Sequence, residues 1–284
     1  MTENAPRACV VGWPIGHSRS PLIHNHWLRA LGLPGAYGRE AVSAEAFPAF
    51  LARIGEDGLR GANVTAPHKE AAFAACDSLS DSAKATGAVN TLWREGGSLC
   101  GDNSDVAGFA ANLDERAEGW DKHGEAAVVI GAGGAALSVV HCLLQSGFQR
   151  VLVVNRSPER AQRLAARFGE RVRSSAWQDL PAFLPGADLL VNASLLGMVG
   201  QDPLELDVEA LAPHAVVADV VYVPLQTHLI RDAEARGLIA VEGLGMLLHQ
   251  ATAGFERWFG VRPEVTPELR ALVEADVRNS ELKR

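Results

Sequence analysis

A lysine in the first third of the chain has the type and position needed to move a proton. Lys69 belongs to the segment Ala62–Glu70, ANVTAPHKE, in which we expect a strand to end and a helix to begin at Pro67. Lys69 then falls in the first helical turn, where a cation opposes the helix dipole, and residues that break such local rules tend to be functional or strained. Its ammonium group can hydrogen-bond a substrate oxygen and exchange a proton with it. An ordinary exposed lysine is the alternative.

An acidic partner for this lysine occurs in the segment Gly101–Asp105, GDNSD, where we expect another strand to end at the start of a helix. Asp105 can orient Lys69 and bind a substrate hydroxyl, or it can serve simply as the N-cap of that helix. Asn63 and Thr65 alternate with a valine along their predicted strand, so both side chains can face the same site.

Two serines have the chemistry of an anion site. In Gly16–Pro21, GHSRSP, Ser18 and Ser20 lie at the start of a predicted helix with proline at its first position. Hydroxyl groups at a helix N-terminus can hold a carboxylate. Ser20 can equally be no more than an N-cap, and Asn90, in GAVNT, is similarly ambiguous.

A glycine-rich turn has the pattern that binds a dinucleotide. The predicted strand Ala126–Ile130 is followed by Gly131–Ala136, GAGGAA, which is a G-x-G-x-x-A turn that opens a helix. The first glycine permits the tight turn, the second lets backbone approach a pyrophosphate, and Ala136 allows close helix–strand packing. We expect the phosphates to bind at the helix N-terminus.

The end of the next predicted strand indicates which dinucleotide binds. About twenty residues downstream, where an NAD-binding protein places an acidic side chain, the chain has Asn155, followed by Arg156 and, four residues later on the same helical face, Arg160. Asn155 does not repel a 2′-phosphate, and a guanidinium group can bind one. We therefore predict NADP rather than NAD, with solvated arginines as the alternative.

Short apolar runs alternate with amphipathic stretches, which predicts an α/β fold with parallel sheets. The expected strands are Ala8–Gly12, Gly61–Thr65, Ala126–Ile130, Arg150–Asn155, Ala187–Asn192 and Ala215–Tyr222. The expected helices include one starting at Ser20, Gly131–Gly147, Pro158–Phe168, Gly245–Gly260 and one from Pro267. We predict two domains: residues 1–106, completed by the helices of 246–284 that pack back on it, and a Rossmann-like, doubly wound NADP-binding domain at 107–245.

Composition excludes several classes of protein. The 284 residues carry 26 Lys and Arg against 34 Asp and Glu, and 48% are hydrophobic, as in a globular protein. An acidic chain without a basic block lacks the positive charge that nucleic-acid phosphates require. It has no secretion signal and no apolar run of about 18 residues, and its four cysteines form no C-x-x-C pair. We expect a cytoplasmic protein without metal, nucleic-acid partner or membrane association.

Nearly the whole chain resembles the shikimate dehydrogenase family. The family's motifs follow in order as GWPIGHSRSP at Gly12–Pro21, NVTAPHKE at Asn63–Glu70, GAVNT at Gly87–Thr91, GDNSD at Gly101–Asp105, the glycine-rich turn, NRS at Asn155–Ser157, NAS at Asn192–Ser194, DVVYVP at Asp219–Pro224, and GLGML at Gly243–Leu247 with Gln250. The chain departs from the pattern at Ser104, where threonine is usual, and at Val106, where glycine is common. Ser104 keeps the hydroxyl, whereas Val106 restricts the backbone beside Asp105.

The resemblance implies a role for each candidate residue. It implies that Ser18 and Ser20 bind the carboxylate of shikimate and that its ring hydroxyls are surrounded by Asn63, Thr65, Asn90, Asp105, Tyr222 and Gln250. Lys69 is then the catalytic lysine and Asp105 its partner. On the cofactor side it implies Gly131, Ala132, Gly133, Gly134 and Ala135 at the pyrophosphate, Asn155, Arg156, Ser157 and Arg160 at the 2′-phosphate, and Val220, Gly243 and Met246 near the nicotinamide.

The implied reaction is reversible, NADP-dependent reduction of 3-dehydroshikimate to shikimate, a step toward chorismate and the aromatic amino acids. The alternatives are a quinate/shikimate or aminoshikimate dehydrogenase of the same superfamily, and a non-catalytic NADP-binding regulator. Retention of both Lys69 and Asp105 argues against the regulator, because a binding module needs no proton donor. The sequence leaves both a monomer and a homodimer open.

Overall fold

The computed structural model describes residues 5–122 and 124–281, which form two compact units. The first extends to Ser104 and includes Gln250–Val273. The second comprises Asp105–His249 and the residues from Glu274 onward. No described helix combines the length and apolar character needed to cross a membrane.

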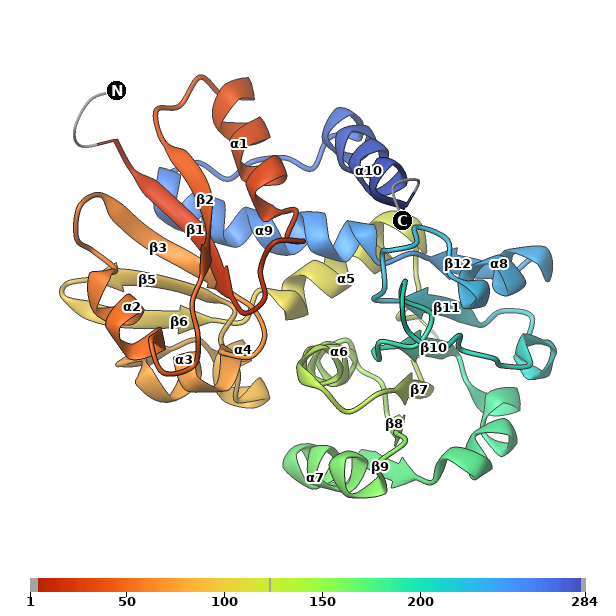
Figure 1. Ribbon diagram of the computed structural model, residues 1–284. Helices are drawn as coiled ribbons and strands as arrows, with labels where there is room; N and C mark the ends of the chain where they lie inside the picture. The colour runs from red at the N-terminus through yellow and green to blue at the C-terminus, as the bar shows by residue number, and fades with distance from the viewer. Residues whose placement is uncertain (1–4, 123, 282–284) are drawn as a thin grey trace. The chain divides into compact units, whose positions relative to one another are not determined.

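The first unit is built on a mixed sheet of six strands (Figure 1). Its order is β2 (Ala36–Ala41), β1 (Arg7–Gly12), β3 (Leu59–Val64), β5 (Thr91–Glu95), β6 (Ser98–Asp102) and β4 (Ser78–Leu79). β1 is parallel to β2 and β3, whereas β5 is antiparallel to β3 and β6. The expectation of a parallel sheet is therefore wrong for this unit. Gly96 and Gly97, both at positive φ, form the tight turn that reverses the chain between β5 and β6.

Helices α1 (Ser20–Ala30), α2 (Phe47–Arg53), α3 (Lys69–Ala75) and α4 (Asp81–Thr86) connect these strands. Two predicted helix starts need correction. α3 begins at Lys69 rather than Pro67, and His68 is its N-cap, whose carbonyl accepts from the N–H of Ala72 at 2.8 Å. Arg19, not Ser20, is the N-cap of α1, and Ser20 is the first helical residue.

The C-terminal helices are α9 (Leu244–Phe259) and α10 (Pro267–Glu281), and the stretch Gln250–Val273 of this region packs in the first unit. The indole Nε1 of Trp258 donates to the Leu92 carbonyl at 2.9 Å, which ties α9 to β5. Trp27 on α1 donates to the carbonyl of Glu264 at 2.9 Å, and its ring packs edge-on against Phe255.

The second unit contains a parallel sheet of six strands, which confirms the doubly wound prediction. Its order is β12 (Ile239–Val241), β11 (Val216–Asp219), β10 (Leu189–Asn192), β7 (Ala126–Ile130), β8 (Arg150–Val154) and β9 (Val172–Ser175). The sequence patterns identified four of these strands and missed β9, whose sequence VRSS is largely polar, and β12, which has three residues. The order reverses between β7 and β10, and ligands of such sheets bind beyond the carboxyl ends of the strands at that point.

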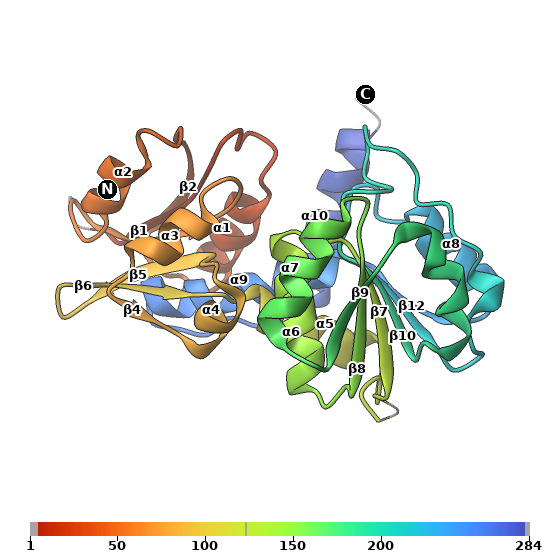
Figure 2. The same ribbon diagram turned by 90° about the horizontal axis from the view of Figure 1, so that it is seen from below.

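Alternation along β7 explains the two-sided core of this unit. Ala127 and Val129 belong to one apolar cluster with α5 (Asp105–Arg116), α6 (Gly134–Gln145) and α7 (Pro158–Phe168). Val128 and Ile130 point to the other face, toward α8 (His228–Ala235) and the 3₁₀ turns η1 (Trp177–Ala182), η2 (Leu184–Gly186) and η3 (Val208–Ala210). Figure 2 shows α6 and α7 on one face of the sheet and α8 on the other.

Candidate active site

Three chain segments that carry candidate residues are joined by backbone hydrogen bonds in the first unit. The N–H of Val64, at the end of β3, donates to the carbonyl of Asn90 at 2.8 Å. The N–H of Asn90 donates to the Asp102 carbonyl at 2.9 Å, and that of Val89 donates to the Lys69 carbonyl at 3.0 Å. The start of α3 and the ends of β3 and β6 therefore converge on the segment around Asn90.

The buried side chain of Asn90 fixes the residue that precedes Asp105. Its Oδ1 accepts from the N–H of Ser104 at 2.9 Å, from the Ser104 hydroxyl at 3.1 Å and from the Thr91 hydroxyl at 2.9 Å. These bonds hold the backbone as it leaves β6 for α5. Asn90 therefore has a positioning role whether or not it also contacts a ligand.

Asn63 is likewise engaged within the protein. Its Oδ1 accepts from the hydroxyl of Tyr37 at 2.6 Å, and its Nδ2 donates to the Asn90 carbonyl at 3.2 Å and to the Thr91 hydroxyl at 3.3 Å. Thr65, directly after β3, donates its N–H to the carbonyl of Val11 at 3.0 Å.

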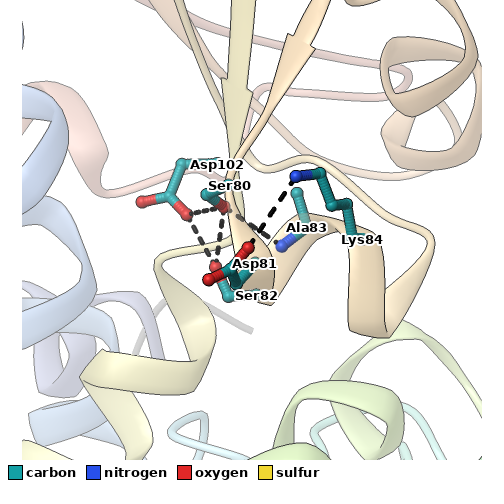
Figure 3. Close-up of polar contacts among 6 residues, drawn as sticks. All are labelled: Ser80, Asp81, Ser82, Ala83, Lys84 and Asp102. Carbon is teal, nitrogen blue, oxygen red and sulfur yellow. Dashed lines mark hydrogen bonds and ion pairs between the residues drawn. The ribbon is translucent and has the colours of Figure 1, made fainter.

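A carboxylate that the sequence patterns did not single out secures the same end of β6. Asp102 Oδ1 accepts from the Ser82 hydroxyl at 2.7 Å, from the Ser80 hydroxyl and from the N–H of Asn103 at 2.7 Å. Ser80 also caps α4 by accepting from the N–H of Ala83 at 3.1 Å (Figure 3). Asp102 thus ties α4 to the segment that leads to Asp105.

Asp105 is the first residue of α5 and is buried. A carboxylate in the first helical turn is favoured by the helix dipole, with or without a chemical role. Asp105 and the half-buried Tyr222 belong to the second unit, whereas the other predicted substrate residues, including the buried Gln250 on α9, belong to the first.

The two serines lie together at the start of α1. Ser18 Oγ donates to Ser20 Oγ at 3.3 Å and accepts from the Ser20 N–H at 3.3 Å. Neither hydroxyl acts as the side-chain cap of α1, whose N-cap is Arg19 without a capping bond. The N-cap alternative for Ser20 is therefore wrong. Pro21 has no N–H, and the N–H of Leu22 donates to the Arg19 carbonyl at 3.0 Å, so the two serine hydroxyls are the groups at this helix start that can bind an anion.

Ser18→Ala and Ser20→Ala are each expected to weaken shikimate binding by roughly 1–2 kcal/mol, the lower end of the range for a hydrogen bond to a charged group. NADP affinity should be unchanged, because the cofactor residues lie elsewhere. Calorimetric titration of both ligands checks this. A fall in thermal stability with unchanged shikimate affinity would assign the serines a structural role alone.

In the second unit, most of the predicted cofactor residues line one pocket of about 770 Å³. These are Gly131, Ala132, Gly133, Gly134, Ala135, Asn155, Arg156, Arg160 and Val220. Gly131 has a φ of 116°, and a Cβ there would lie 2.7 Å from the Ala193 carbonyl oxygen, so the position requires glycine. A Cβ on Gly133 or Gly134 would meet nothing within 4 Å, which leaves this backbone open to the pocket.

Contrary to the sequence prediction, Arg156 and Arg160 do not lie on one helical face, although both line the pocket. α7 begins at Pro158, so Arg156 precedes the helix and shares no helical face with Arg160. Both are exposed and line the same pocket. Arg160 lies in the first turn of α7, where a cation opposes the helix dipole and a bound anion would compensate for this repulsion.

The other two predicted residues of this group shape the turn before α7. Asn155 Nδ2 donates to the carbonyl of Ser157 at 3.0 Å, which holds the turn. Ser157 is the N-cap of α7 and does not line the pocket.

The residues predicted near the nicotinamide lie around the start of α9. Val220 lines the pocket, and a Cβ on Gly243 would lie 2.5 Å from the Val220 carbonyl carbon, so Gly243 packs directly on that backbone. Met246 is 8% exposed and belongs to the apolar core of the unit. Its placement is explained by packing alone.

Buried Asp219 holds the loop that carries Val220 and Tyr222. Its Oδ1 accepts from Asn192 Nδ2 and from the N–H of Val221, both at 2.9 Å, and its Oδ2 accepts from the Thr227 hydroxyl at 2.7 Å. Burial raises the pKa of Asp219 from 3.8 to about 6, although these three donors lower it in part.

Asp219 is expected to make stability depend on pH. Because its folded pKa is raised, its contribution to the free energy of unfolding is fully present below about pH 4 and is lost as the pH rises to about 6, by about 3 kcal/mol. Denaturant titrations of the wild type and Asp219→Asn between pH 4 and 7 check this. The isosteric variant cannot ionise and should lack this component, so parallel pH profiles for the two proteins would contradict the assignment.

Models of known protein families match three parts of the chain. The model for the shikimate dehydrogenase substrate binding domain matches residues 10–92. The models for shikimate / quinate 5-dehydrogenase and the shikimate 5′-dehydrogenase C-terminal domain match residues 114–196 and 243–272.

Individual relatives match along nearly their full length. Shikimate dehydrogenase (NADP(+)) from Rhodopseudomonas palustris (strain HaA2) is 57% identical over 270 residues, 95% of this chain and 96% of the relative. The crystal structure of shikimate 5-dehydrogenase from Thermus thermophilus in complex with NADP(H) and shikimate is 36% identical, with a TM-score of 0.83 over 96% of this chain and 99% of that one. Quinate dehydrogenase from Corynebacterium glutamicum in complex with NAD is 29% identical, with a TM-score of 0.87 over 95% and 99%. The chain therefore belongs to the shikimate dehydrogenase family of NADP-dependent oxidoreductases.

Proposed function

We propose that the chain catalyses the reversible, NADP-dependent reduction of 3-dehydroshikimate to shikimate. The observation that carries the proposal is the hydrogen-bonded convergence on Asn90, which brings together the backbone of Lys69 and the segment leading to Asp105. An arrangement that holds a proton donor and a carboxylate on rigid elements suits an oxidoreductase better than a simple binding protein.

The substrate contacts follow from charge and donor type. Ser18 and Ser20, at the start of α1, bind the carboxylate. The Lys69 ammonium hydrogen-bonds the carbonyl oxygen that is reduced and delivers its proton, while Asp105 orients Lys69 and a ring hydroxyl. Thr65, Tyr222 and Gln250 supply further polar groups for the ring hydroxyls, and Asn63 and Asn90 hold the surrounding backbone in place.

The second unit suits NADP. The open backbone at Gly133 and Gly134 and the uncapped N-terminus of α6 fit a pyrophosphate, and Arg156 and Arg160 fit a 2′-phosphate. When bound, NADPH supplies the hydride. The protein aligns the substrate and stabilises the negative charge that develops on its oxygen.

Quinate oxidation with NAD is the second candidate, since a quinate dehydrogenase bound to NAD shares the fold. Asn155 followed by Arg156 favours NADP, because no carboxylate occupies the position that would repel a 2′-phosphate. We further propose a cytoplasmic location, supported by four free cysteines.

Steady-state oxidation of shikimate and quinate, each with NADP and with NAD, tests the proposal. We expect the highest kcat/KM for shikimate with NADP. Faster quinate oxidation with NAD would favour the second candidate, and tight NADP binding without turnover of either substrate would indicate a non-catalytic regulator.

A further inference from the structure

We infer that Trp177 stacks on the adenine of the cofactor and is part of the affinity of this chain for the adenosine end of NADP. This inference rests on the proposed function, because it places the 2′-phosphate at Arg156 and Arg160. Neither the sequence patterns nor the comparisons assign a role to Trp177.

The sheet register places Trp177 beside the arginines. β9 runs parallel to β8, and Ser175 lies opposite Val154. Trp177 and Arg156 are therefore each two residues beyond this pair, on neighbouring strands and at the carboxyl edge where ligands of such sheets bind. Both residues line the same pocket.

Packing does not account for the position of this indole. Trp177 is 36% exposed, and among the described residues it belongs to neither apolar cluster of its unit. Leu180 and Leu184, both 1% exposed, anchor η1 and η2 in the core. The turn is thus held by other side chains, and a large aromatic surface is left facing a pocket.

Among the described residues, the other large hydrophobic side chain that lines this pocket and is exposed lies on the opposite side of the switch point. Leu195 follows β10, which is separated from β8 by β7, whereas Trp177 follows β9, the direct neighbour of β8. In NADP the purine and the 2′-phosphate are attached to adjacent carbons of one ribose. The aromatic side chain on the arginine side is therefore the one within reach of the purine, and purines stack favourably on indole faces.

Adenosine 2′,5′-bisphosphate, which lacks the nicotinamide half, isolates this end of the site. Calorimetric titration should show binding roughly five- to tenfold weaker for Trp177→Ala, the lower part of the range for base–aromatic stacking, since the indole is partly open to solvent. Trp177→Phe should retain most of the affinity. Phe183→Ala is the matched control, because Phe183 is an exposed aromatic of the same segment, 41% exposed, that lines a different pocket; it should bind like the wild type.

A fluorescence measurement distinguishes direct stacking from an indirect effect. Adenosine 2′,5′-bisphosphate should quench part of the tryptophan emission of the wild type, and the quenching should be lost in Trp177→Phe although the ligand still binds. Equal affinities of the wild type and Trp177→Ala, or unchanged quenching in Trp177→Phe, would overturn the inference and leave the proposed function intact. A wild type that does not bind adenosine 2′,5′-bisphosphate would overturn both.

Discussion

Lys69→Ala is expected to lower the turnover number by about 10²–10⁴, the range for loss of a general acid–base group. Shikimate affinity should change much less, because the ammonium interacts most strongly with charge that develops on the substrate oxygen during hydride transfer. Steady-state kinetics and calorimetric titration with shikimate separate the two effects.

The neighbouring helix α4 offers a matched control. Lys84 has a side chain 63% exposed and lies 3.8 Å from the exposed carboxylate of Asp81 (Figure 3). Lys84→Ala removes the same charge from the same unit and should keep near-normal turnover. A Lys69→Ala enzyme with similarly normal turnover would remove Lys69 from the mechanism.

Coupling between Lys69 and Asp105 can be measured directly. Asp105→Asn should also reduce turnover, and a double variant should lose far less than the sum of the two single losses if the residues act as a unit. Additive losses would show independent roles.

Arg156→Asp is expected to reverse the cofactor preference from NADP to NAD. The change removes a charge-assisted hydrogen bond to the 2′-phosphate, worth about 1.5–3 kcal/mol, and adds a carboxylate that repels the phosphate. NADP affinity should therefore fall by about 10² or more, while NAD, whose ribose carries a hydroxyl there, gains an acceptor. Ratios of kcat/KM for the two cofactors measure the change.

Arg163→Asp controls for net charge in this experiment. Arg163 is an exposed residue of α7, the helix that follows Arg156, and does not line the cofactor pocket. The Arg163→Asp variant should keep the preference for NADP over NAD. Equal NADP affinities for Arg156→Asp and Arg163→Asp would mean that the 2′-phosphate binds elsewhere.

Local sequence patterns were sufficient to predict the features that depend only on residues close together in the chain. The turn at Gly131, the extended backbone of β7 with side chains pointing to alternate faces, and the proline near the start of α1 are each set by steric limits within a few residues. The motifs around Ser18, Lys69 and Asp105 are read in the same way, and together they carried the resemblance to the family. The doubly wound fold of the second unit followed from strands and helices that alternate along the chain.

The remaining features of the fold and the site depend on contacts between residues far apart in the sequence, and no local pattern encodes such contacts. The antiparallel pairing of β5 with β3 makes the first sheet mixed. β9, whose sequence VRSS is largely polar, and β12, which has three residues, are defined by the strands that they pair with. The pKa of Asp219 depends on its burial, which raises it, and on hydrogen-bond donors such as Asn192, 27 residues away in the sequence, which lower it. Trp177 reaches the pocket of Arg156 only because β9 pairs with β8. A hydrogen bond, a pKa or a pocket is determined by which residues meet after folding, and that depends on the packing of the whole unit.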